Sequence, residues 1–313
     1  MSEVRRIKAD SVWPHRLAVA LACATFPLLF IGGLVTSKGA GLAVPDWPTS
    51  FGYNMFLYPW SKMVGGIFYE HSHRLVASVV GFLTIILAGT FWFKESRAWL
   101  RWLGVAALIL VIIQGVLGGL RVVLLEYTLA IVHACLAQAF FALTVSLALF
   151  TAPEWRRPLA EEPFADGGKV RGLCAMTTAM IYLQIALGAV LRHTGTRVDA
   201  HLFFALIVAV HVILILRRVT KFDPRRPRLS RPAVFLTILL AIQILLGVGS
   251  YFAKFTPYLR LPMKAVVPLT TTHLVIGALM LATALLLTLR SYRLSGARAP
   301  LPKHNILSEQ FSS

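Results

Sequence analysis

The stretch Tyr69–Phe82, YEHSHRLVASVVGF, decides the fold, because it opens a long apolar run that continues to about residue 93. It also places polar side chains, among them Glu70 and His73, at the mouth of that run. About 20 consecutive apolar residues are enough to cross the hydrocarbon core of a bilayer as an α-helix. The stretch therefore predicts a membrane-spanning helix with ionisable groups near one end.

The rest of the chain has the same character. Of its 313 residues, 57% are hydrophobic and only 14% are charged, far from the averages of a soluble domain. Comparable apolar runs occur at about 16–36, 70–93, 101–120, 128–151, 172–191, 199–217, 232–252 and 267–289. Backbone polar groups in lipid must be satisfied within their own segment, so each run is expected to be helical. We therefore predict an all-α integral membrane protein with eight transmembrane helices.

The basic residues predict its orientation. Lysine and arginine cluster before the first run and after the second, fourth, sixth and eighth, most densely in Arg217–Arg231, RRVTKFDPRRPRLSR. Positively charged loops stay on the cytoplasmic side, so both termini are expected there, in a bacterial inner membrane. Topology and contact with anionic membrane lipid account for the net charge of +18, and nucleic acid is not expected as a partner.

Two features repeat along the runs. The third, fifth and seventh runs carry the pattern Q-x-x-L-G, starting at Gln114, Gln184 and Gln243. Small residues at such positions let helices approach closely, whereas an amide inside a membrane span usually has a partner. The even-numbered runs each carry a histidine near their outer ends, and these are His73, His133, His201 and His273.

Each of these histidines, taken alone, is compatible with a core residue bonded to a neighbour. Taken together, four imidazoles at one depth on alternate helices indicate bis-histidine ligation of heme, which needs two axial nitrogens from facing helices. Two pairs predict two heme positions. No carboxylates or thiolates are grouped with the histidines, so zinc, copper and non-heme iron are less favoured.

Two arginines are candidates for binding heme propionates. Arg121 and Arg192 occupy nearly equivalent places after the third and fifth runs, on the predicted outer side, and guanidinium suits bidentate binding of carboxylate. Ordinary interface residues are the alternative interpretation. The remaining histidines are not expected to be ligands: His211 lies deeper, His71 points elsewhere, and His15, His193 and His304 are predicted in loops or tails.

The outer-loop sequence GGLVTSKGAGLAVPDWPTSFG at 32–52, the E-x-x-H of Glu70 and His73, the four histidines and the plan of eight runs together resemble the heme A synthase family over about residues 16–290. The resemblance implies oxidation of the C8 methyl of heme O to a formyl group, giving heme A for cytochrome oxidase. It implies a cofactor heme b ligated by His201 and His273. The iron of the substrate heme would then lie between His73 and His133.

The resemblance also implies two pseudo-symmetric four-helix bundles. The predicted parts are a cytoplasmic segment at 1–15, an N-terminal substrate bundle at 16–151, a cytoplasmic linker at 152–171, a C-terminal heme b bundle at 172–290 and a cytoplasmic tail at 291–313. Implied partners besides heme O are heme O synthase, an electron-transfer partner and oxidase assembly factors, and a homo-oligomer is left open.

Two positions distinguish this chain and its halves. Many family members have a cysteine pair in the first outer loop, with one cysteine immediately before PDWP, where this chain has Val44. When His73 is aligned with His201, Glu70 falls on Val198, so only the N-terminal half carries the acid. Glu70 is therefore the candidate catalytic proton acceptor, and a simple ion pair with Arg74 or a helix cap is the alternative.

The sequence is compatible with two reaction routes and with two roles for the first outer loop. Either His73 or His133 leaves the iron to admit an oxidant, or the methyl group is oxidised stepwise and water supplies the oxygen. The first outer loop with Trp47 either covers the substrate heme or anchors the protein at the membrane interface. Other functions considered are an electron-transferring b-type cytochrome, which would not need Glu70, and a heme carrier. A prenyltransferase would need aspartate-rich magnesium motifs, which are absent.

Overall fold

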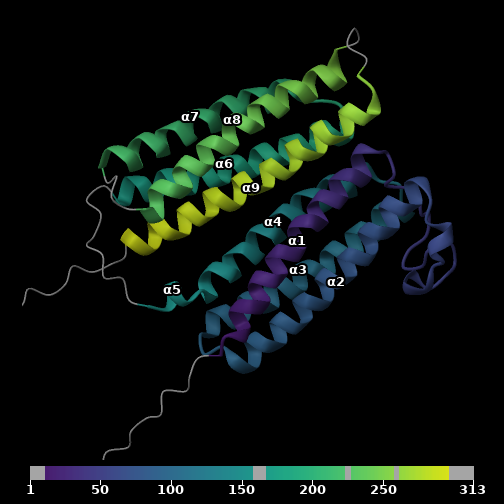
Figure 1. Cartoon of the computed structure of the whole chain (residues 1–313), viewed down its shortest axis with the longest axis horizontal. Helices are drawn as coiled ribbons and strands as arrows, with labels where there is room; N and C mark the ends of the chain where they lie inside the picture. The colour runs from purple at the N-terminus through teal and green to yellow at the C-terminus, as the bar shows by residue number, and fades with distance from the viewer. Residues whose placement is uncertain (1–10, 158–166, 223–226, 257–260, 296–313) are drawn as a thin grey trace, which may run out of the picture.

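The computed structural model describes residues 11–157, 167–222, 227–256 and 261–295 (Figure 1). Residues 1–10 of the predicted N-terminal segment, 158–166 of the predicted linker and 296–313 of the predicted tail, which includes His304, lie outside the described residues. The described chain is helical without a strand. The prediction of an all-α protein is confirmed.

Within the described residues, eight helices are long and apolar enough to cross a membrane, and they match the eight predicted runs. The helices are α1 (Trp13–Ser37), α2 (Gly65–Lys94), α3 (Ala98–Val123), α4 (Tyr127–Thr151), the short α5 (Pro153–Arg156), α6 (Gly167–Thr194), α7 (Val198–Phe222), α8 (Pro227–Phe255) and α9 (Met263–Ser295). Two short 3-10 turns, Met55–Leu57 and Trp60–Lys62, lie in the long loop between α1 and α2.

The helices extend beyond the apolar runs at both ends. Helix α6 begins at Gly167, inside the predicted linker. His15 and His193, predicted in loops, lie in α1 and α6, so that prediction was wrong. The physical reason is that a helix continues into polar flanking sequence wherever its backbone groups can still bond within the helix.

The contacts divide the long helices into two groups of four (Figure 1). In the first group α1 and α3 each pack against α2 and α4, around a core that includes Leu21, Phe91 and Leu147. In the second group α6 and α8 each pack against α7 and α9, around a separate core. Helices α1, α4 and α9 meet at the seam, and α4 also contacts α6. The boundaries, pseudo-symmetry and membrane orientation of the predicted bundles stay predictions.

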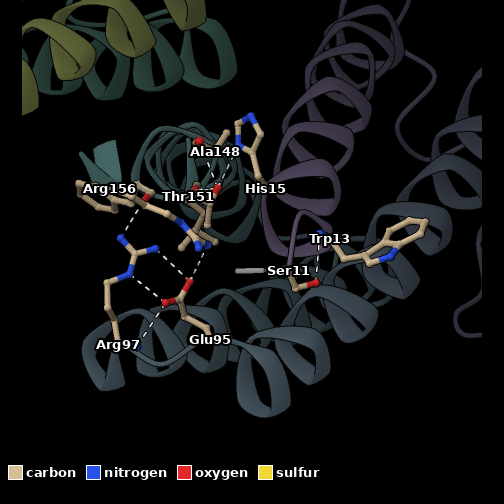
Figure 2. A network of polar contacts seen from close by, with 10 residues as sticks. Ser11, Trp13, His15, Glu95, Arg97, Ala148, Thr151 and Arg156 are labelled. Atoms are coloured by element: carbon tan, nitrogen blue, oxygen red, sulfur yellow. Dashed lines mark hydrogen bonds and ion pairs between the residues drawn. The ribbon is translucent and has the colours of Figure 1, made fainter. Parts of the chain in front are cut away.

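A polar network lies at the end of the first group where α2 ends and α3 begins (Figure 2). Glu95, between α2 and α3, accepts hydrogen bonds from Arg97 at 2.9 Å and from Arg156 of α5 at 3.4 Å. Burial of Glu95 favours its neutral form, but the hydrogen bonds and charge of Arg97 outweigh burial and hold the pKa of Glu95 below its usual value. Nearby, His15 of α1 lies 3.2 Å from the hydroxyl of Thr151 in α4. These contacts tie the turn between α2 and α3 to α5, and the start of α1 to the end of α4.

Candidate functional site

The four candidate ligands lie near the N-terminal ends of the second, fourth, sixth and eighth membrane-spanning helices. They are His73 in α2, His133 in α4, His201 in α7 and His273 in α9. Each keeps part of its surface accessible, although it lies inside its helical group. The antiparallel arrangement of consecutive helices brings all four to the same end of the molecule.

The histidines of the second group face each other. The ring centroids of His201 and His273 are 6.4 Å apart, with ring planes at 69°. A metal–imidazole bond is about 2 Å long, so two imidazoles on opposite sides of one metal have centroids roughly 6 Å apart. The spacing of this pair therefore fits two axial ligands of a single heme iron.

The histidines of the first group share an electrostatic environment. His73 interacts with His133, and the guanidinium of Arg121 in α3 interacts with both. The charge of Glu70 also acts on Arg121. His73, His133 and Arg121 therefore lie within electrostatic range of one another, and Glu70 lies within range of Arg121.

Every candidate ligand packs against a glycine of the preceding spanning helix. The pairs are Gly32 with His73, Gly118 with His133, Gly188 with His201 and Gly247 with His273. A Cβ at any of these glycines would approach the ring to 3.1–3.2 Å, closer than an ordinary van der Waals contact. Three of the glycines are the last residue of the Q-x-x-L-G pattern. The glycines therefore leave room for imidazole rings as well as for the approach of helices.

The donor atoms around the four histidines fit heme. The Nδ1 atoms of His133 and His273 are buried without a hydrogen-bond partner, which native proteins rarely tolerate unless a bound group changes the local bonding. Among the described residues no three of His, Cys, Asp or Glu group closely enough to hold a metal ion by themselves. Pairs of imidazoles in apolar helical groups suit a cofactor that brings its own equatorial ligands.

Glu70 is buried, 4% exposed, and both of its oxygens have partners. Oε1 accepts a hydrogen bond from Nη2 of Arg74 at 3.0 Å, and Oε2 accepts one from the backbone N–H of Val44 at 2.9 Å. The ion pair considered from the sequence therefore forms. The contact with Val44 was not predicted, because the sequence does not reveal where an irregular loop returns to a helix.

Arg74 also binds the loop that contains Val44, through its guanidinium group. Its Nη1 donates to the carbonyls of Asp46 at 2.7 Å and Thr49 at 3.0 Å, and its Nη2 donates to the carbonyl of Val44 at 2.9 Å. With Glu70, Arg74 binds both sides of the PDWP turn. The outer loop is thus attached directly to the helical turn that contains His73.

The loop is also organised internally by Asp46. Its carboxylate accepts hydrogen bonds from the backbone N–H groups of Phe51 at 2.7 Å and Gly52 at 2.9 Å, and from the hydroxyl of Thr49. Partial burial raises the pKa of Asp46, but these hydrogen bonds outweigh it and lower the pKa from 3.8 to about 2. Phe51 and Gly52 both have positive φ, at 52° and 77°, a conformation that the carboxylate helps to hold.

Trp47 lies over the first helical group rather than projecting only into the surroundings. Its indole fills the space beside Gly119 of α3, where a Cβ would collide with the ring. Gly119 directly follows Gly118, the neighbour of His133. The arrangement favours a covering role for the loop over the interpretation as a membrane anchor, although the indole remains 38% exposed.

The two candidate propionate arginines contact backbone in the structure. Arg121 donates from Nη2 to the carbonyl of Gly41 at 3.0 Å. Arg192 donates from Nη2 to the carbonyl of Gly33 at 2.8 Å and to the hydroxyl of Ser37 at 2.7 Å. Arg121 therefore links the loop to α3, and Arg192 links α6 to α1. Their contact with propionates stays a prediction.

Three of the other histidines have partners of their own. His71 lies 3.1 Å from the hydroxyl of Ser50 and packs on Tyr58, and His211 bonds to the carbonyl of Ile207 at 2.9 Å. His15 contacts Thr151 as described above. Their exclusion as ligands stays a prediction.

The described residues form an all-α multi-pass membrane protein with histidines gathered near one end of its spanning helices, and comparison with known proteins narrows this class. Residues 53–200 match the COX15-CtaA family, described as cytochrome oxidase assembly protein. That match includes Glu70, His73 and His133 and ends just before His201.

Curated bacterial relatives named heme A synthase are also similar to the chain. The protein of Shouchella clausii is 30% identical over 58% of this chain and 59% of its own length. The protein of Alkalihalophilus pseudofirmus is 30% identical over 53% of this chain and 55% of its own length. The protein of Lysinibacillus sphaericus is 29% identical over 57% of this chain and 58% of its own length. The chain thus aligns with less than two thirds of the length of each of these relatives. The matches support the heme A synthase family for this multi-pass bacterial membrane protein.

Proposed function

We propose that this protein is a heme A synthase, which oxidises the C8 methyl group of heme O to a formyl group and so supplies heme A to cytochrome oxidase. The observation that carries the proposal is the difference between two otherwise similar histidine pairs. Both pairs lie against glycines of the preceding helices, but only the first has a buried carboxylate, Glu70, one helical turn from a ligand. Val198 stands at the corresponding place in the second group.

The second group would hold heme b as the resident cofactor. His201 and His273 would hold its iron, and the 6.4 Å separation of their ring centroids supports this assignment. When bound, heme b supplies a one-electron redox centre. Apolar side chains of α6, α7, α8 and α9 surround the deeper part of this group and would keep water from it.

The first group would bind the substrate, with His73 and His133 as ligands of the heme O iron. Oxidation of a methyl to a formyl group removes protons as well as electrons, so a nearby proton acceptor is required. Glu70 is the proposed acceptor, because it lies one helical turn before His73. Arg74 balances its charge, and the loop with Trp47 would limit access of water to the reacting edge.

Arg121 and Arg192 would bind propionates, exchanging their present backbone acceptors for carboxylates. The proposed partners are heme O synthase as the source of substrate, an electron acceptor, and oxidase assembly factors as recipients of heme A. Self-association is compatible with this proposal.

The proposal is tested by separating the two halves with alanine substitutions. His201→Ala and His273→Ala should each remove most of the heme b, measured as pyridine hemochrome on the purified protein. His73→Ala and His133→Ala should retain heme b but lose conversion of heme O. Loss of heme b from the first-group variants with activity intact would reverse the two assignments.

The alternative of an electron-transferring cytochrome is distinguished by the same preparations. A cytochrome would hold heme b in both groups, and all four variants would lose heme without any effect on heme O. A heme carrier would release heme O unmodified. Either result would refute the proposed synthase.

A further inference from the structure

We propose that the glutamine of each Q-x-x-L-G motif is a positioning residue that fixes the iron-ligating histidine of the next spanning helix, and that His73 is the one ligand without such a residue. The inference rests on the proposed function and goes beyond it. It assigns Gln114 to His133, Gln184 to His201 and Gln243 to His273.

The three glutamines already contact their histidines. Nε2 of Gln114 donates to the carbonyl of His133 at 3.1 Å, and Nε2 of Gln184 donates to the carbonyl of His201 at 2.9 Å. Nε2 of Gln184 also lies 3.1 Å from Nδ1 and 3.3 Å from Nε2 of the His201 imidazole. The third pair is looser, with Nε2 of Gln243 at 3.4 Å from Nε2 of His273. One amide therefore lies beside each histidine, from the same position of the repeat.

Hydrogen-bonding capacity is left over on both sides of these contacts. The Oε1 atoms of Gln114, Gln184 and Gln243 are buried without a partner, and so are the Nδ1 atoms of His133 and His273. A histidine that ligates a metal through one ring nitrogen usually donates its other N–H to a nearby acceptor, which fixes ring orientation and raises ligand basicity. In the structure the nitrogen of each amide, rather than its oxygen, contacts the histidine, so a half-turn of the amide would present Oε1 as that acceptor, in sites where an unpaired polar atom is otherwise costly.

His73 differs in two independent ways. The residue four positions before its glycine, Gly32, is Leu28, an aliphatic side chain that packs in the core and cannot accept a hydrogen bond. Its ring is also turned differently. His73 presents Nε2 to Gly32 at 3.1 Å, whereas the other three histidines present Cε1 to their glycines. His73 is therefore the least constrained ligand, and displacement of a ligand from the substrate iron, if it occurs, falls on His73 rather than His133.

The heme b half offers a test that needs no turnover. In the full-length protein, Gln184→Leu and Gln243→Leu should each lower heme b affinity about 10–100-fold, the usual effect of losing such a partner. They should also shift the heme b midpoint potential to more positive values, because a less basic ligand stabilises ferric iron less. Gln184→Glu and Gln243→Glu keep an acceptor, so their potentials should lie at or below that of the unsubstituted protein.

Gln138→Leu is the matched control, since it removes a buried glutamine of α4 that lies outside the motif. Its heme b affinity and potential should stay unchanged. Potentials that move in the same direction in the Leu and Glu variants would indicate a packing role and overturn the inference. Unchanged affinity and potential in the Leu variants would also overturn it, while leaving the synthase proposal intact. Failure of the unsubstituted protein to bind heme would refute both.

The difference between His73 and His133 is tested by adding a glutamine beside His73 and by removing the glutamine beside His133. In protein loaded with heme O, Leu28→Gln should slow cyanide binding to the substrate iron, because His73 gains a partner. Gln114→Leu should speed it, because His133 loses one. Heme b content, measured in the same samples, reports correct folding. Cyanide rates unaffected by both substitutions would contradict the assignment of His73 as the labile ligand.

Discussion

Replacement of Glu70 by Gln is the most informative perturbation of the proposed reaction. The substitution keeps the size of the side chain and one acceptor oxygen, but removes the proton-accepting charge. It also disturbs the loop, since Glu70 binds Arg74 with one oxygen and the N–H of Val44 with the other. The substitution therefore has a chemical effect on proton transfer and a structural effect on the loop, and the two differ in size.

The chemical effect is expected to be larger than the structural one. Loss of a proton-transfer group typically lowers a rate by about 10²–10⁴-fold, which corresponds to roughly 3–5 kcal/mol in the barrier. Glutamine can still accept from Arg74, so the structural loss is the single bond to Val44. A buried donor left without its acceptor costs about 1–3 kcal/mol. We therefore expect heme A formation to fall at least about 100-fold, with the heme b content unchanged.

Arg74→Met provides the matched control because it damages the loop more severely than Glu70→Gln does. It removes three bonds to loop carbonyls in addition to the ion pair, but leaves the carboxylate in place. The assay is conversion of heme O to heme A per heme b, with hydrogen exchange at residues 44–53 as the measure of loop order. Exchange should increase more in Arg74→Met, whereas conversion should fall more in Glu70→Gln.

The opposite ranking would refute the reasoning. If Arg74→Met lowered conversion as much as Glu70→Gln, in proportion to exchange in the loop, Glu70 would serve as a loop anchor. Wild-type conversion in Glu70→Gln would leave the first group without an identified proton acceptor.

Three further predictions follow from local geometry. Because the pKa of Asp46 is lowered, its stabilising effect on the loop is complete above about pH 3.8 and is lost as pH falls through about 2. Tryptophan emission from the loop should therefore change over that interval. Asp46→Asn should abolish the change. Glu95→Ala removes a buried acceptor, so thermal unfolding in detergent should show a loss of about 1–3 kcal/mol while heme b content is retained. Gly247→Val should displace His273 and lower heme b content, whereas Gly115→Val, whose Cβ would have nothing within 4 Å, should retain it.

The helices were predictable because apolar run length is a property of consecutive residues. The eight runs and the depth of the histidines follow from counting along the chain, and all eight appear as helices. The ends of the helices were less predictable, since α6 starts in polar sequence at Gly167. Helix termini depend on local capping and on neighbours, which hydropathy does not record.

The surroundings of the ligands were only partly predictable. The glutamines of Q-x-x-L-G were recognised as needing partners, but the histidines that they contact lie on the next helix. Aligning Gln114 with His133 and Gln184 with His201 across short connections would have suggested the pairing. Contacts of Glu70 with Val44 and of Arg121 with Gly41 could not be found this way, because they depend on the path of an irregular loop.

The most direct test of the proposed function is pigment analysis of membranes that contain this protein together with a source of heme O. Extracted hemes are separated and identified by mass, with membranes lacking the protein as the control. The account predicts that heme A, carrying the formyl group, forms only when the protein is present and is lost in His73→Ala. Recovery of heme O unchanged, from membranes in which the protein is present and contains heme b, would contradict it.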